Sequence, residues 1–248
     1  MRPATTPDEV VGRLRALGFP PEAADELAAH FIDCERRGKT GHGLARVDWL
    51  GTLPDLEPEA APERVAAEEC FERWESNGAV GYLTLAAVCA AQLANPPGRA
   101  RLVVARCFPT GALGYWVRRV ADGGLVGVLT ATSPARLSHP DGGRPLAGTN
   151  PLAIAIPSSD GRPLVSDVSM GAVTWGDVIA GTATADELVP FGGAQAHKAF
   201  ALAVGLQLLA DSLVGDGFGA VLLVARPEAD PVPAFRELAA GVRLPGDA

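Results

Sequence analysis

Two side chains near the start of the chain have the chemistry to hold and protonate a small acid. His42 stands between two glycines, and Arg46 follows it by four residues. If this segment begins a helix, the two side chains share one face. Histidine exchanges protons near neutral pH, and arginine binds a carboxylate through two parallel hydrogen bonds. The pair suits an enzyme of 2-oxo acids or imino acids; a helix-entry histidine beside a surface arginine is the alternative.

Two later segments carry residues that could bind an anion or assist the histidine. The turn at 148–151, Gly-Thr-Asn-Pro, precedes an expected strand and can present backbone N–H groups to a phosphate or carboxylate. Asp167 ends an apolar strand, where a carboxylate can orient His42 or hold a ribose. A loop-to-strand junction explains the first segment equally simply, and capping of a turn explains the second.

A glycine-rich turn at 190–193, Pro-Phe-Gly-Gly, leads into a long expected helix. The N-terminus of such a helix can bind an anion through its free N–H groups. His197 and Lys198 follow within the first turns and add polar donors and positive charge. A plain turn into a helix is the alternative interpretation.

Periodicity and turn residues predict an α/β or α+β chain, with helices at both ends and a sheet between them. We expect helices over 7–17, 21–38, 83–93, 114–120, 194–214 and 233–240, and strands over 102–105, 125–129, 152–156, 163–167 and 221–224. Thr6 before Pro7 and two acids predicts a capped start for the first helix. The strand–helix–strand order over 102–129 suggests a βαβ-like unit, and 52–62 reads as a surface connection.

Composition excludes several classes of protein. The chain has 248 residues, 48% of them hydrophobic and 20% charged, with a formal net charge of -8. This is globular, and the acidic balance argues against nucleic acid or an anionic membrane as partner. The four cysteines (Cys34, Cys70, Cys89 and Cys107) lack metal-ligand spacing, so we expect reduced cytosolic thiols and no metal site. The G-x-G-x-x-G motif of Rossmann dehydrogenases is absent from the sequence.

In this order, the four segments resemble the malate/L-lactate dehydrogenase family. That family carries S-H-G-x-x-R, G-T-N-P, L-D-x-A-T-S, P-x-G-G and H-K-G-Y-G-L. The counterparts here are His42 with Arg46; Gly148, Thr149, Asn150 and Pro151; Ser166 with Asp167; Gly192 with Gly193; and His197 with Lys198. Gly111, Gly114 and Tyr115 match a further family helix, and the resemblance covers roughly residues 5–225.

The resemblance implies a non-Rossmann fold with a mixed central sheet and a cytoplasmic homodimer that uses NADPH or NADH. Its substrates are small 2-oxo or 2-hydroxy acids or cyclic imino acids. By resemblance, the catalytic residues are His42 and Asp167, the substrate-binding residues are Arg46, His197 and Lys198, and the cofactor-binding residues are Gly148, Thr149, Asn150, Gly192 and Gly193. Residues 1–78 with 190–248 would form a helical lobe on the dimer and substrate side, and 79–189 a cofactor-side α/β lobe.

The sequence also departs from the family pattern. Gly41 replaces the family serine, Pro109 replaces a histidine, and Ala199 and Ala201 replace two glycines of H-K-G-Y-G-L. Losing both glycines removes space for close backbone approach, and Gln207 stands where an acid is expected. Two other functions therefore remain open. One is acid/base chemistry without a dinucleotide, such as cyclisation, isomerisation or elimination, and the other is non-catalytic binding.

Overall fold

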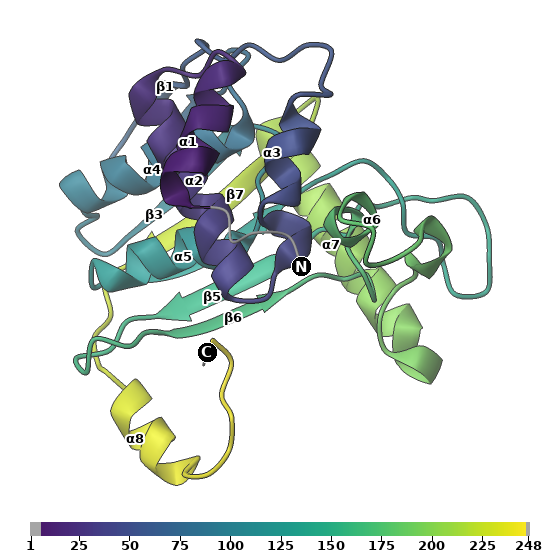
Figure 1. The fold of residues 1–248 in the computed structure, drawn as a ribbon. Helices are drawn as coiled ribbons and strands as arrows, with labels where there is room; N and C mark the ends of the chain where they lie inside the picture. The colour runs from purple at the N-terminus through teal and green to yellow at the C-terminus, as the bar shows by residue number, and fades with distance from the viewer. Residues whose placement is uncertain (1–5, 247–248) are drawn as a thin grey trace.

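Seven strands form one mixed sheet in the computed structural model, which describes residues 6–246 (Figure 1). Their order across the sheet is β1-β2-β3-β7-β4-β5-β6. The strands are β1 Glu63–Ala67, β2 Phe71–Glu75, β3 Ala100–Arg106, β4 Val126–Ala131, β5 Leu152–Ile156, β6 Leu164–Val168 and β7 Gly219–Ala225. The pair β2 and β3 is parallel, and the other neighbouring pairs are antiparallel. The predicted mixed α/β fold is confirmed.

Helices cover both faces of this sheet. They are α1 Pro7–Ala16, α2 Pro21–Arg36, α3 Ala45–Leu50, α4 Gly81–Ala94, α5 Leu113–Asp122, α6 Trp175–Ile179, α7 Ala196–Val214 and α8 Val232–Leu238. Short 3-10 turns lie at Thr40–His42, Ala185–Glu187 and Gly193–Gln195. Alternation along β3 shows the two layers: Val103 packs with the α4 and α5 core, while Val104 packs under Ala210 and Val214 of α7.

The predicted helix starts follow from local chemistry. The Thr6 side chain accepts a hydrogen bond from the Glu9 N–H, and the Glu9 side chain accepts one from the Thr6 N–H, so the expected cap is a full capping box. The predicted βαβ-like unit is also present as β3, α5 and β4. Its two strands are parallel to each other, but β7 lies between them.

Strands β1 and β2 are absent from the sequence prediction. β1 is a mostly exposed edge strand, and β2 reads Phe-Glu-Arg-Trp-Glu, which looks like solvated surface. In the folded chain Glu72 of β2 is buried and accepts hydrogen bonds from Trp74 Nε1 at 3.1 Å and Gln92 Nε2 at 2.8 Å. Arg101 forms an ion pair with it at 3.4 Å. Gln92 of α4 and Arg101 of β3 come from other elements, so hydrophobic periodicity does not reveal the strand.

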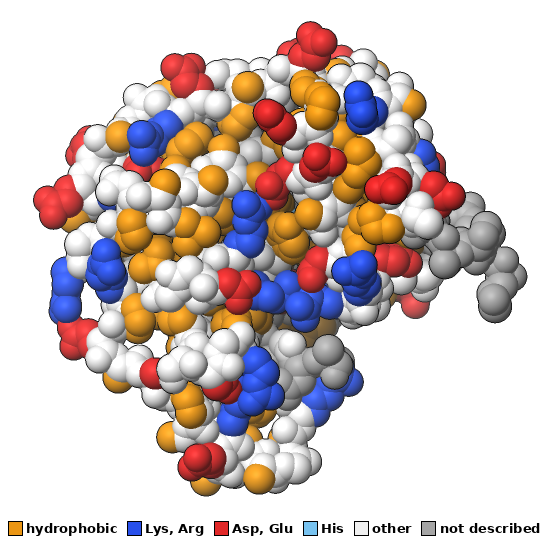
Figure 2. All heavy atoms as spheres, turned by 60° about the vertical axis from the view of Figure 1, so that its left-hand side comes forward, with side chains coloured by type: hydrophobic (Ala, Val, Ile, Leu, Met, Phe, Trp, Pro, Cys, Tyr) orange, Lys and Arg blue, Asp and Glu red, His pale blue; other side chains and the backbone are white. Residues whose placement is uncertain are grey.

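The sheet crosses the two lobes expected from the resemblance. β1 and β2 precede residue 79 and β7 follows residue 189, yet all three belong to the same sheet as β3 to β6. The division of labour between a substrate-side lobe and a cofactor-side lobe stays a prediction. Charged side chains of both signs are interspersed with apolar ones on the face that Figure 2 shows.

One helix among the described residues, Gly193–Val214, is long and apolar enough to cross a membrane by length and composition. Core helices of soluble proteins meet the same length and composition criteria, so this helix is weak evidence for a membrane-spanning segment. The helix packs one side on β7 and leaves Leu202, Leu208 and Leu209 exposed. Its apolar character is therefore explained only partly by the core of this chain.

Candidate active site

A cavity lies at one edge of the sheet, where three strands end and one begins. β3 and β4 both pair antiparallel with β7, and β5 is antiparallel to both β4 and β6, so β3, β4 and β6 run the same way. The segments that follow them meet the segment that precedes β5. The cavity there measures about 550 Å³, within the range of small-molecule sites, roughly 300–1,000 Å³. The 3-10 turn Thr40–His42, α3 and α6 close its other side.

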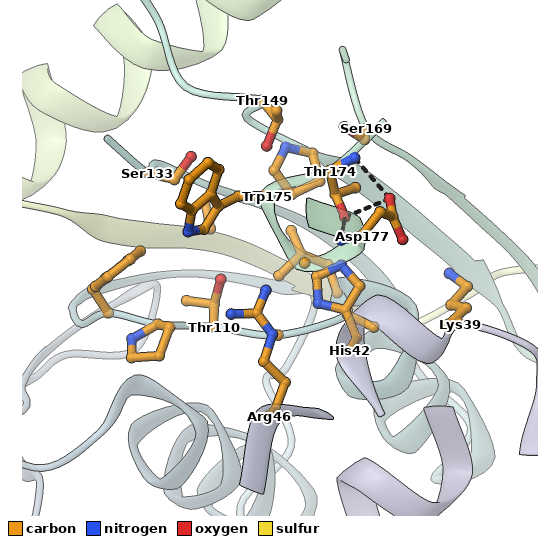
Figure 3. A pocket seen from close by; sticks show the side chains of 18 of the residues that line it. Lys39, His42, Arg46, Thr110, Ser133, Thr149, Ser169, Thr174, Trp175 and Asp177 are labelled. Carbon is orange, nitrogen blue, oxygen red and sulfur yellow. Dashed lines mark hydrogen bonds between the residues drawn. The ribbon is translucent and has the colours of Figure 1, made fainter. Parts of the chain in front are cut away.

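His42 and Arg46 both line this cavity. The intervening chain is not one continuous helix, because His42 ends a 3-10 turn and Arg46 lies in α3. In Figure 3 both side chains point upward in the view, the His42 ring beneath Thr174 and Asp177 and the Arg46 guanidinium to the left of that ring. Arg46 is 6% exposed, and its Nε donates to the Gly41 carbonyl at 2.9 Å. Its Cζ lies 4.8 Å from the ring centroid of Trp49.

The His42 imidazole is held neutral in the free protein. Burial, as the largest cause, and the positive charges of Arg46 and Lys39 together lower its pKa to about 3. Its Nδ1 is buried and has no hydrogen-bond partner among the described residues. An anion bound against Arg46 would cancel part of this positive field, so the pKa of His42 rises when an acid binds. The same side chain can then accept a proton in one state and donate it in the other.

Asp167 lines the cavity but is not hydrogen-bonded to His42. Its carboxylate forms an ion pair with Lys39, which comes from the loop after α2. The Asp167 side chain is 12% exposed, and Gly114 at the start of α5 makes room for it. A Cβ at Gly114 would lie 2.8 Å from Asp167 Oδ2. Asp167 is therefore paired with Lys39, one of the two cations that lower the pKa of His42, and the predicted orienting hydrogen bond is absent from the described structure.

Helix α6, which sequence reasoning missed, completes the cavity. Thr174 and Asp177 form a capping box, and the signal was present in the sequence as Thr-x-x-Asp. α6 packs so closely on the 3-10 turn that a Cβ at Gly41 would collide with Asp177, and a Cβ at Gly176 with the Gly41 carbonyl. The family serine at position 41 therefore has no room here, which is the physical reason for glycine.

The Gly-Thr-Asn-Pro turn contributes Thr149 and Pro151 to the cavity. Asn150 instead points into the protein, with a φ of 22°. Its Nδ2 donates to the Ala203 carbonyl and to Gln207 Oε1 of α7, each at 2.9 Å. The Gly148 N–H also reaches Gln207 Oε1, at 3.4 Å. In this chain Gly148 and Asn150 lock the turn to α7 and leave Thr149 facing the cavity.

The glycine-rich turn opens on a different cavity. Gly192 and Gly193 have φ angles of 107° and 55° and line a second hollow of about 580 Å³. The segment 134–140 borders both hollows, with Arg136 on the first and His139 on the second. His197 and Lys198 are exposed and line neither. Their predicted role in substrate binding has no support from the geometry of a single chain.

A second buried histidine supports the cavity wall from behind. His30 of α2 is fully buried, and its Nε2 accepts a hydrogen bond from the Ala112 N–H at 3.3 Å. It stacks on Trp116 and contacts Tyr82 edge-on. Tyr82 lines the cavity, and its buried hydroxyl has no partner among the described residues. Burial raises the pKa of Tyr82 to about 12, so it remains a hydrogen-bond donor at neutral pH.

Acid should destabilise the fold through these two histidines. Burial lowers the pKa of His30 to about 3, as it does for His42, whereas both titrate near 6.5 in the unfolded chain. Between pH 6.5 and 3 only the unfolded state binds the two protons, so the free energy of unfolding falls as pH falls. We expect the pair to contribute about 4 kcal/mol of loss between pH 7.5 and pH 5. Urea unfolding at both pH values measures it.

The variant His42→Asn separates this contribution from that of the carboxylates. It should remove about half of the histidine-dependent loss, because only His30 then takes up a proton on unfolding. An unchanged pH dependence in the variant would show that His42 titrates normally in the folded protein.

Comparison with known proteins assigns this fold and its cavity to a protein family. The sequence profile of the malate/L-lactate dehydrogenase family matches residues 3–184. The chain belongs to this family, as its motifs predicted.

Named relatives narrow the comparison. The (2R)-3-sulfolactate dehydrogenase (NADP(+)) of Chromohalobacter salexigens is 31% identical over 84% of this chain and 70% of its own length. The Delta(1)-pyrroline-2-carboxylate/Delta(1)-piperideine-2-carboxylate reductase of Pseudomonas syringae pv. tomato is 31% identical over 81% of this chain and 66% of its own length. The chain thus spans about two thirds of these relatives.

Solved structures agree on the fold. A dehydrogenase from Sinorhizobium meliloti superposes with a TM-score of 0.82 at 22% identity, covering 100% of this chain and 89% of that one. The delta1-piperideine-2-carboxylate reductase of Pseudomonas syringae superposes with a TM-score of 0.80 at 23% identity, covering 98% and 91%.

Proposed function

We propose that the protein is an NAD(P)H-dependent oxidoreductase of a small 2-oxo or 2-hydroxy acid or a cyclic imino acid. One observation carries the proposal: within residues 6–246, a buried guanidinium without a carboxylate partner and a buried imidazole nitrogen without a hydrogen-bond partner lie in one cavity. Arg46 supplies the first and His42 the second. A carboxylate beside a reactive C=O or C=N group satisfies both at once.

In this function Arg46 binds the substrate carboxylate through two parallel hydrogen bonds. His42 delivers a proton to the carbonyl oxygen or imine nitrogen in reduction and accepts it in oxidation. Asp167 moderates the charge of Lys39 beside it. When bound, a reduced nicotinamide supplies the hydride, and the oxidised form accepts one.

The donor chemistry of the cavity fits a dinucleotide. Hydroxyl groups of Ser133 and Thr149 line the cavity, and they are suited to ribose and phosphate. The Gly192 and Gly193 turn leads into α7, where free N–H groups suit a phosphate. These residues would hold the cofactor, together with the turn that contains Gly148 and Asn150.

A redox-free acid/base enzyme is the second candidate. The specific observation in its favour is that His42 and Arg46 share one cavity while Gly192 and Gly193 open on another. Ala199 in the first turn of α7 is buried, and its side chain occupies space that the family glycine leaves free. Cyclisation, isomerisation or elimination would need the first cavity alone.

Titration of the purified protein with NADPH and NADH decides between the two candidates. We expect saturable binding of at least one, seen as enhanced nicotinamide fluorescence and as binding heat. Binding should then permit turnover of 2-oxo or cyclic imino acids. A folded sample that binds neither cofactor at millimolar concentration contradicts the redox function and favours the second candidate.

The surface of α7 suits a homodimer. Leu202, Leu208 and Leu209 expose an apolar stripe that a second copy would bury. Light scattering on the sample used for the titration should give twice the chain mass, and a monomeric mass would exclude the dimer. The partners inferred for this protein are a second copy and a small carboxylate substrate.

A further inference from the structure

Two arginines in the active-site cavity are each stacked on a tryptophan. Arg46 lies over Trp49, as described above, and the Cζ of Arg136 lies 3.7 Å from the ring centroid of Trp175. All four side chains line the same cavity. Stacking fixes the plane of a guanidinium and leaves the N–H groups at its edge free to bind a ligand.

Neither arginine has an acidic partner in the part of the chain that the structure describes. The two carboxylates that line the cavity are already engaged. Asp167 pairs with Lys39, and Asp177 accepts hydrogen bonds from the N–H and hydroxyl of Thr174. A guanidinium stays charged in proteins, so the cavity keeps two positive charges that an anion can neutralise. Burial also lowers the pKa of Arg136, the expected sign of a cation without a counter-ion.

Both guanidiniums meet the start of α6. A Cβ at Gly176 would lie 2.8 Å from Nη2 of Arg46, so this guanidinium contacts the backbone at Gly176. Arg136 stacks on the preceding residue, Trp175. The two cations therefore border the same cavity at the start of α6.

We propose that Arg136, held on Trp175, is a second anion site that binds the distal acid group of the substrate. Arg46 and His42 hold the end that reacts, and Arg136 holds a carboxylate or sulfonate a few bonds away. The preferred substrate class is then the dianionic 2-oxo or 2-hydroxy acid, above the monoacid and the cyclic imino acid. This deepens the proposed function and rests on the same cavity.

Binding of L-malate and L-lactate without cofactor tests the site. The two acids share the 2-hydroxy carboxylate end, and L-malate has the additional distal carboxylate. Calorimetry on the full chain should show L-malate binding about 10- to 100-fold more tightly. In Arg136→Met this ratio should fall to near one, and Arg136→Lys should retain part of it because the charge remains without the planar fork.

The matched control is Arg144→Met, which removes the same charge from an exposed position eight residues along the same segment. Its binding ratio should equal that of the unmodified protein. Circular dichroism of each variant confirms that it is folded.

A second measurement distinguishes whether Arg136 binds the distal acid group of the substrate or a phosphate of the dinucleotide. If Arg136 instead serves a phosphate of the dinucleotide, Arg136→Met weakens NADPH binding and leaves the malate-to-lactate ratio unchanged, which overturns the proposal. No saturable heat from L-malate at tens of millimolar overturns it as well. Because the first measurement needs no cofactor, selective L-malate binding by a protein that binds neither NADPH nor NADH would contradict the redox function alone.

Discussion

Replacement of His42 by asparagine should lower the turnover number on a 2-oxo acid by about 10²- to 10⁴-fold. Asparagine keeps a polar side chain but cannot exchange a proton, and the described residues offer no second imidazole that lines the cavity. Tyr82 is a donor there, but burial raises its pKa to about 12, so it releases a proton poorly at neutral pH. Steady-state rates with saturating cofactor measure the effect.

The affinity for the substrate should survive this change, because Arg46 still binds the carboxylate. Retained binding heat for L-lactate or L-malate in His42→Asn is the control that the cavity is intact. A variant that keeps more than a tenth of the activity would remove His42 from the proton step and point to Tyr82 or water.

The pH dependence of kcat/KM provides a second test of His42. In the free protein the pKa of His42 is lowered to about 3 by burial and by Arg46 and Lys39. The value of kcat/KM reports the free enzyme, so oxidation of a 2-hydroxy acid should not lose activity near pH 6.5 as an ordinary histidine base would. Substitution of Arg46 by methionine should move the acid limb toward pH 6.5.

Arg46→Met should also have the second-largest effect, a loss of about 100-fold in kcat/KM for any carboxylate substrate. The loss should be mainly in KM, since the guanidinium binds substrate and product alike. Arg36→Met is the matched control, because Arg36 is exposed at the end of α2 and lies outside the cavity.

The effect of Arg46→Met on stability should be small or favourable. Arg46 is buried, lacks a carboxylate partner among the described residues, and donates from Nε to the Gly41 carbonyl at 2.9 Å. Removing an uncompensated buried charge relieves its desolvation cost, while the methionine stem keeps contact with Trp49. A folded variant with lost activity then separates binding from folding. An unchanged KM would show that the carboxylate is bound elsewhere, with Arg136 as the first alternative.

Local sequence chemistry is sufficient to predict some parts of the fold. Some elements depend only on neighbours in the chain, so the sequence predicts them. They are the cap at Thr6, the start of α2 at Pro21 and the apolar strand β7. His42 and Arg46 are also near neighbours, and two short helical turns bring them together. The family motifs point to the same two residues without any tertiary contact.

Tertiary structure decided the rest, because the partners come from distant segments. Lys39 meets Asp167 across 128 residues, and Arg136 meets Trp175, only where strands end at one edge of the sheet. The same folding leaves His197 on the surface, away from the cavity.

The sequence by itself therefore determined the family, the sheet-and-helix class and the choice of His42 and Arg46 as candidate site residues. Only the tertiary structure decided which charges stay uncompensated. Pairing of a charge depends on which element packs beside it, and spacing along the chain does not report that. Arg46 and Arg136 remain without carboxylate partners in the described chain because Lys39 and Thr174 already engage the nearby acids.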